Sequence, residues 1–281
     1  MSVNLEQFIP AARPWVENLV NVWPTPYVKP NFAFWEVGHV LSLIALGGAT
    51  ILMNLRLIGV GLTQEPPSEI YRNLRTVQTL GVVGIVLTGV LIGMANAERL
   101  YDSPAFIVKM LALMGGLILT YGVSRTTAAA EGRVSTAAKA WFVLGMAFWL
   151  AALVVFLTGG LIAPGIWHVI TAAALLVLFV TKGRARIVYA GVLAALVVAQ
   201  ELAPLFYDPA VFYRPGDRTG VDPIDVGFCI VIPAWIVGTA LVQFFGAGHG
   251  EQGGPLTKII GCATILVWLT SAAAGRWIAF A

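Results

Sequence analysis

The sequence predicts an all-α membrane protein, a polytopic helical bundle of about eight transmembrane helices. The chain has 281 residues, of which 58% are hydrophobic and only 11% charged, whereas a soluble domain carries about 25% charged residues. A helix needs roughly 20 apolar residues to cross a bilayer, and eight stretches reach or approach that length. They are residues 33–59, 76–97, 104–123, 139–162, 165–181, 186–205, 226–246 and 256–280.

The segment before the first span predicts a leader that lies on the membrane surface. Residues 4–22 mix apolar and polar side chains, and Trp15, Trp23 and Tyr27 are suited to anchoring at an interface. We expect a short amphipathic helix over 4–22, with a loosely structured leader as the open alternative. The predicted organisation is therefore a leader over 1–31 and a transmembrane bundle over 32–281.

Basic residues predict the orientation of the bundle. Cytoplasmic loops of membrane proteins carry an excess of Lys and Arg. The loops after the first, third, fifth and seventh spans hold most of these residues, and no basic run indicates nucleic-acid binding. We therefore expect both termini outside, in a multi-pass protein of a bacterial inner membrane. The residues concerned are Arg72, Arg75, Arg125, Arg133, Lys139, Lys182, Arg184, Arg186 and Lys258.

A few ionisable residues lie inside the apolar segments and predict a polar site. Glu36 and His39 are near the start of the first span, Lys109 near the start of the third, His168 at the start of the fifth, and Arg276 near the end of the last. If the spans alternate in direction, all of these reach the outer third of the membrane on one side. A charge inside a bilayer costs at least about 2.5 kcal/mol, so such a cluster is a functional-site hypothesis.

Each of these residues also has a purely structural interpretation. Glu36 and Lys109 could form an ion pair, and Lys109 or Arg276 could extend to the membrane surface. His168 fits an interfacial belt of polar and aromatic side chains. His39 differs, because it lies inside a span beside an acid and away from a chain end, and it is the strongest functional candidate.

Two further patterns concern small residues. Glycines in the first three spans, including Gly38 and Gly89, permit close helix packing or a flat ligand between helices. The triplet Leu87-Thr88-Gly89 recurs as Leu157-Thr158-Gly159, which suggests a weak internal duplication.

Three segments resemble a poorly characterised family of bacterial membrane proteins. Members begin with an E-x-x-H span that ends in D-L-R-L-L-G, like Trp35–Val40 and Asn54–Gly59 here. Their third span opens as N-P-A-F-x-x-K, matched by Asp102–Lys109, and they finish in W-x-x-x-x-x-x-G-R-x-I-A-Y, matched by Trp268–Phe280. The resemblance covers a core of 32–125 and 256–281, and the helices over 139–247 are extra to it. Asn54 replaces the family's acid and Phe280 its tyrosine.

More distantly, the pattern of His39 in the first span and Lys109 in the third is similar to the copper-resistance D-type superfamily. That superfamily includes a heme-binding membrane protoporphyrinogen oxidase. The resemblance implies a heme b site in which His39 binds the iron, as imidazole commonly does. Glu36 would orient the ring, Lys109 and Arg276 would pair with heme propionates, and His168 is the candidate second ligand.

Three functions follow as hypotheses. The first is a cytochrome b-like protein that transfers electrons near the outer face, with a quinone or a periplasmic redox partner. The second is copper or other metal handling, although the chain has no Met-x-x-Met cluster of the kind that binds copper(I). We expect Cys229 and Cys262 to be buried thiols. The third is a non-catalytic anchor or assembly subunit of an envelope complex, docking through the loop 206–225. The sequence leaves open whether the protein is an enzyme.

Overall fold

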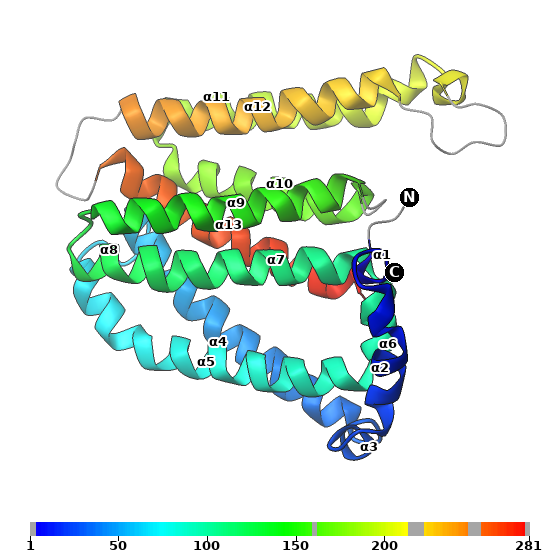
Figure 1. Ribbon diagram of the computed structural model, residues 1–281. Coiled ribbons are helices and arrows are strands. Elements are labelled where there is room, and N and C mark those ends of the chain that lie inside the picture. The colour runs from blue at the N-terminus through cyan, green and yellow to red at the C-terminus, as the bar shows by residue number, and fades with distance from the viewer. Residues whose placement is uncertain (1–3, 159–161, 213–221, 247–253, 279–281) are drawn as a thin grey trace. The chain divides into compact units, whose positions relative to one another are not determined.

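The protein is a bundle of long helices, shown in Figure 1. The computed structural model describes residues 4–158, 162–212, 222–246 and 254–278, and no strand occurs within these ranges. Seven helices in them are long and apolar enough to cross a membrane, which confirms the predicted polytopic bundle. Their elements are α4 (Phe32–Ile58), α5 (Pro67–Ala95), α7 (Pro104–Ile118) with its continuation, α9 (Thr136–Thr158), α11 (Gly183–Leu202), α12 (Pro223–Gly246) and α13 (Pro255–Trp277).

The remaining predicted span, residues 165–181, corresponds to α10 (Ile162–Val180). Two other spans are longer than expected. Helix α5 begins nine residues before position 76, because its first two turns are polar but still helical. Helix α7 continues through a π-helical turn (Leu119–Ser124) into α8 (Arg125–Ala129).

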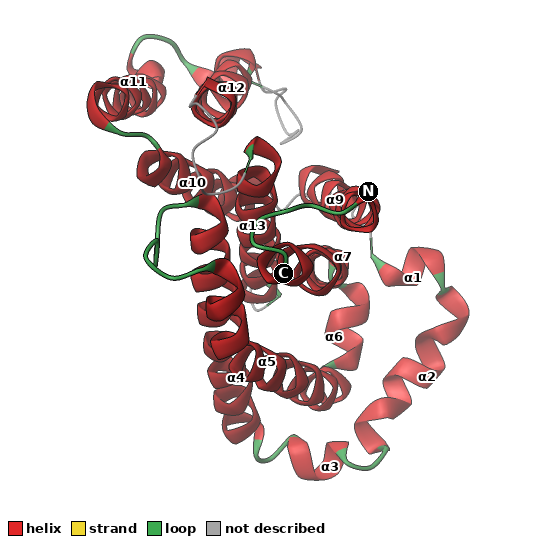
Figure 2. Cartoon of the chain, turned by 90° about the vertical axis from the view of Figure 1, so that its left-hand side faces the viewer, coloured by secondary structure: helices red, strands yellow, loops and turns green. Residues whose placement is uncertain are grey.

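The leader is a series of short turns, and the expectation of one helix over 4–22 is wrong. It contains α1 (Leu5–Phe8), α2 (Arg13–Asn18) and α3 (Thr25–Val28), separated by 3₁₀ turns at Pro10–Ala12 and Leu19–Asn21. Proline lacks the N–H that a helix interior requires, so the prolines of this segment interrupt the helix. Figure 2 shows the leader as an arc around one side of the bundle end.

Arg13 attaches the leader to α6 (Ala97–Asp102). Its guanidinium pairs with Glu6 at 2.9 Å and with Asp102 at 3.1 Å. The hydrogen bond to Glu6, aided by the charge of Asp102, raises the pKa of Arg13 above its usual value. The Tyr101 hydroxyl adds a hydrogen bond to the carbonyl of Ile9. These contacts fix the leader at the end of the bundle where α4 and α7 begin.

The chain divides into two compact units, 1–169 with 249–281, and 170–248. In the first unit α4 packs against α5 and α13, and α7 packs against α9 and α13. One buried cluster combines Val108 and Ala112 of α7 with Ala152 and Phe156 of α9 and Ala274 of α13. These helices form the framework on which the candidate site is built.

Glycines set how closely these helices approach. A Cβ on Gly81 of α5 would lie 2.6 Å from the backbone nitrogen of Leu46 on α4. A Cβ on Gly261 of α13 would lie 2.9 Å from the carbonyl oxygen of Asn54. Both contacts are with backbone, which cannot rotate away, so glycine is required at these two crossings.

A buried hydrogen-bonded network ties four elements together at the C-terminal half of α4. The Asn54 amide donates to the carbonyl of Thr50 at 2.8 Å and accepts from the Ser124 hydroxyl at 2.9 Å. Ser124 also contacts Thr264 at 2.9 Å, and Gln78 donates to the Thr50 hydroxyl at 3.0 Å. The amide of Asn54 uses both a donor and an acceptor, which a carboxylate at this position would not supply.

The second unit contains α11 and α12 with most of α10. The Tyr189 ring stacks on Trp235 at 6.4 Å between centroids, and the Trp235 indole donates to the Tyr189 carbonyl. Asp222 caps α12 by accepting from the backbone N–H of Ile224 at 2.8 Å. Burial acts to raise the pKa of Asp222, but hydrogen bonds from Tyr207 and from the backbone outweigh it and lower the pKa.

Candidate functional site

The start of α4, the start of α7 and the last turn of α13 lie at the same end of the first unit (Figure 1). His39 lies early in α4, Lys109 early in α7 and Arg276 in the final turn of α13. The structure therefore places these three predicted residues at the same end of the bundle.

The neighbours of His39 define which of its ring nitrogens is free. Nδ1 lies 2.8 Å from the hydroxyl of Thr88 on α5. Thr88 donates its only proton to the carbonyl of Gly84 at 2.6 Å, so we assign Nδ1 as the donor to Thr88. In the neutral imidazole Nε2 then carries a lone pair, and it has no hydrogen-bond partner in the described part of the chain. A neutral imidazole binds a metal through the ring nitrogen that carries the lone pair, so Nε2 is the atom of His39 that could do so.

Lys109 supplies a cation at the same end of the bundle as His39. Its side chain lies along Gly275 of α13, where a Cβ would be 3.7 Å from Nζ. Within the described ranges the Lys109 ammonium has neither an ion-pair partner nor a hydrogen bond. A half-buried charge without a partner is costly in a protein interior, so Lys109 is suited to an anionic ligand.

Trp35 adds an unsatisfied donor near the site. Its indole nitrogen is buried and has no hydrogen-bond partner among the residues that the structure describes. Residues four apart share one face of a helix, so Trp35 lies one turn from His39 on the same side of α4. Buried polar groups are nearly always paired, and an unpaired one calls for an explanation. A ligand that accepts a hydrogen bond here would provide one.

The other predicted residues, Glu36, His168 and Arg276, are all exposed. Glu36 is exposed and, among the described residues, does not pair with Lys109. The expectation that Glu36 orients the imidazole is not met, because Thr88 holds Nδ1. His168 is exposed on α10, whereas the helices packed against α4 are α5 and α13. Arg276 is exposed, one residue beyond the glycine that contacts Lys109.

Thr88 is the site residue that sequence reasoning missed. The triplet Leu87-Thr88-Gly89 was a signal, since both Thr88 and Gly89 contact the ring, and a Cβ on Gly89 would lie 3.4 Å from Cε1 of His39. The side chain of Thr158 and all of Gly159, which form the matching triplet, lie outside the described residues. The structure therefore leaves the proposed duplication as a prediction.

The described residues contain no group of three or more His, Cys, Asp or Glu that could hold a metal ion. Both cysteines are free thiols. Cys262 is partly buried, but the expectation of a buried thiol is wrong for Cys229, which is exposed on α12. Helix α12 is apolar on every side, so its sequence does not distinguish a face that packs on protein from a face that meets lipid.

The fold and the site together define a polytopic helical membrane protein with a polar site near one end of its bundle. Residues 27–171, about half of the chain, match a family of unknown function (DUF6644), and the chain belongs to that family. The matched segment runs from α3 into α10 and contains His39, Thr88 and Lys109. No curated protein and no solved structure matches the chain.

Proposed function

We propose that this protein binds heme b at the His39 end of the bundle and transfers electrons there. The observation that carries the proposal is the state of His39, whose Nδ1 is held by Thr88 while Nε2 has no partner in the described chain. Neutral imidazole is a standard axial ligand of heme iron. An imidazole oriented in this way inside an apolar helix supports the proposal.

A metal that brings its own ligands fits this site better than a bare ion. Structural and catalytic metal sites in proteins commonly use three or four protein ligands. The described residues offer one imidazole here and no cluster of three metal ligands. In heme, the porphyrin supplies four nitrogen ligands, so a single histidine is sufficient. This consideration favours heme over the copper-handling alternative.

The polar groups around His39 suit the carboxylates of a heme. Lys109 is a cation without a partner in the described residues, and Trp35 is a buried N–H donor without one. A propionate could accept hydrogen bonds from both, which would satisfy groups that are otherwise costly to bury. Arg276, in the last turn of α13 at the same end of the bundle, would pair with the second propionate.

When bound, the heme would supply one-electron chemistry, and the chain's own residues would tune it. Thr88 fixes the ring tautomer, and the surrounding apolar helices limit access of water. Both are known means of setting the potential of a heme iron. A site near the end of the bundle would be within reach of a membrane quinone or of a redox partner outside the membrane.

Replacing Thr88 tests whether the imidazole is held for a ligand. Thr88→Val keeps the side-chain shape but removes the acceptor from Nδ1, and we expect heme affinity to fall about 10- to 100-fold. Heme titration monitored by visible absorption, together with the midpoint potential, measures the effect. Thr79→Val is the matched control, because Thr79 is exposed on the same helix and bonds only to the Arg75 carbonyl. Equal heme affinity in the two variants would remove Thr88 from the site.

A further inference from the structure

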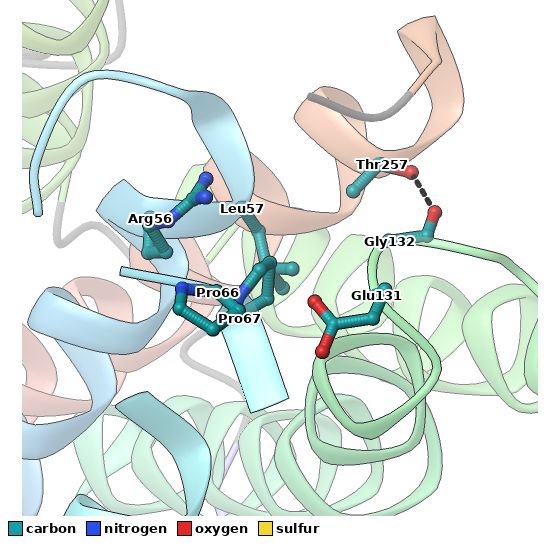
Figure 3. A pocket seen from close by; sticks show the side chains of 7 residues that line it. All are labelled: Arg56, Leu57, Pro66, Pro67, Glu131, Gly132 and Thr257. Carbon is teal, nitrogen blue, oxygen red and sulfur yellow. Dashed lines mark hydrogen bonds between the residues drawn. The ribbon is translucent and has the colours of Figure 1, made fainter. Parts of the chain in front are cut away.

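A small pocket lies at the opposite end of α4 from His39, about 26 Å away by the helical rise. Its volume is about 180 Å³, less than the roughly 300 Å³ at which sites for drug-sized ligands begin. Arg56, Pro66 and Pro67 line it together with Glu131 and Thr257 (Figure 3). All of them belong to the first unit. The pocket has room for a small polar group.

Arg56 is a buried cation that the protein leaves incompletely paired. Only 6% of the residue is exposed. Its Nε donates to the carbonyl of Glu65, which fixes the loop before α5. Nη1 and Nη2 have no hydrogen-bond partner in the described chain. Since guanidinium is always charged and presents its donors as a planar fork, these two nitrogens are suited to an anion such as phosphate.

Glu131 supplies the opposite charge from a strained turn. Its backbone has φ of 53°, a left-handed conformation that residues other than glycine rarely adopt, and Gly132 follows with φ of 83°. The Thr257 hydroxyl donates to the Gly132 carbonyl at 2.7 Å and so ties this turn to α13. Strain of this kind is costly, and where it is observed it motivates a functional hypothesis.

The two charges line the same pocket but do not neutralise each other. In the described ranges Arg56 and Glu131 form no ion pair. A simple anion would be attracted by Arg56 and repelled by Glu131. A ligand that carries an anion and a cation side by side would satisfy both groups.

From these observations we infer that the pocket binds a phosphate group with an adjoining primary ammonium, the chemistry of a phosphoethanolamine headgroup. The phosphate pairs with the Nη atoms of Arg56, and the ammonium pairs with the Glu131 carboxylate. The pocket lies where α4 ends and α5 begins, at the end of the bundle that also carries Arg72, Arg75 and Arg125. Basic pockets between transmembrane helices are known sites for lipid headgroups.

Lipid binding to purified, delipidated protein in detergent tests this inference. Native mass spectrometry would compare phosphatidylethanolamine with phosphatidylglycerol, and calorimetry would measure binding of free phosphoethanolamine. We expect a preference for phosphatidylethanolamine over phosphatidylglycerol. If phosphatidylethanolamine binds and free phosphoethanolamine does not, the pocket is assigned to a membrane lipid. If phosphatidylethanolamine and free phosphoethanolamine both bind, the headgroup is sufficient.

Single substitutions identify the residues that bind the headgroup. Arg56→Lys should weaken binding about tenfold or more, because it removes the fork but keeps the charge. Glu131→Gln should weaken phosphatidylethanolamine binding about three- to fivefold, as expected for an exposed ion pair, without weakening phosphatidylglycerol binding. Glu69→Gln is the control, since this acid pairs with Arg72 and does not line the pocket. Lack of any headgroup preference, or the same binding in Glu131→Gln and Glu69→Gln, would overturn the inference.

Discussion

His39→Ala should abolish heme binding by the purified protein, the largest functional effect that we expect from any single change. The variant removes the imidazole that Thr88 orients at 2.8 Å, and the described residues near it offer no other histidine. A heme that has lost its axial ligand keeps only its apolar and propionate contacts, so affinity should fall more than 100-fold. The measurement is the Soret absorbance per mole of protein after reconstitution with hemin.

The fold should tolerate this substitution, because His39 is only half-buried. Circular dichroism and gel filtration in detergent would establish that the variant is folded. His168→Ala is the matched control: this histidine is exposed on α10, and we expect it to leave the Soret absorbance unchanged. If His39→Ala bound heme like the original protein, His39 would not be the ligand.

Gly81→Ala should produce the largest loss of stability. The added Cβ would lie 2.6 Å from the backbone nitrogen of Leu46 and 2.9 Å from its Cα. Helix α4 would have to move away from α5 along their whole contact, because backbone atoms cannot rotate aside. Overpacking of this kind costs about 1–3 kcal/mol. A denaturation curve in detergent, followed by circular dichroism, measures the change in the free energy of unfolding.

Gly47→Ala is the control for this prediction, since a Cβ at Gly47 meets no atom within 4 Å. Alanine favours a helix by up to about 1 kcal/mol over glycine, so this variant should be as stable as the original or slightly more so. A Gly81→Ala variant with unchanged stability would show that α4 and α5 do not cross as closely as the structure indicates.

The long helices could be predicted from the sequence to within a few residues, apart from the polar start of α5 and the extension of α7. Apolar stretches of this length have few alternatives to a membrane span. The amphipathic pattern of the leader predicts one helix, but its prolines interrupt that helix. Pro10, Pro14 and Pro24 each prevent the regular hydrogen bonding of a longer helix.

The site was only partly predictable, for a geometric reason. Because successive spans alternate in direction, the sequence alone predicts that His39 and Lys109 lie at the same end of the bundle. The partner of His39 depends on how α4 and α5 are rotated about their axes, which close contacts at Gly81 and Gly84 determine. The sequence also does not show whether a threonine in an apolar helix bonds to a side chain on another helix or only to its own backbone. The pocket of Arg56 and Glu131 combines chain segments about 75 residues apart, and only the folded chain reveals it.

The central claim is that the His39 end of the bundle holds a heme, and the visible spectrum of the protein tests it most directly. The protein should be produced in cells supplied with heme precursor, purified in mild detergent, and measured oxidised and then reduced with dithionite. We expect a Soret band that shifts on reduction, with near-stoichiometric heme by pyridine extraction. A featureless spectrum from folded protein, unchanged when hemin is added, would contradict the proposal.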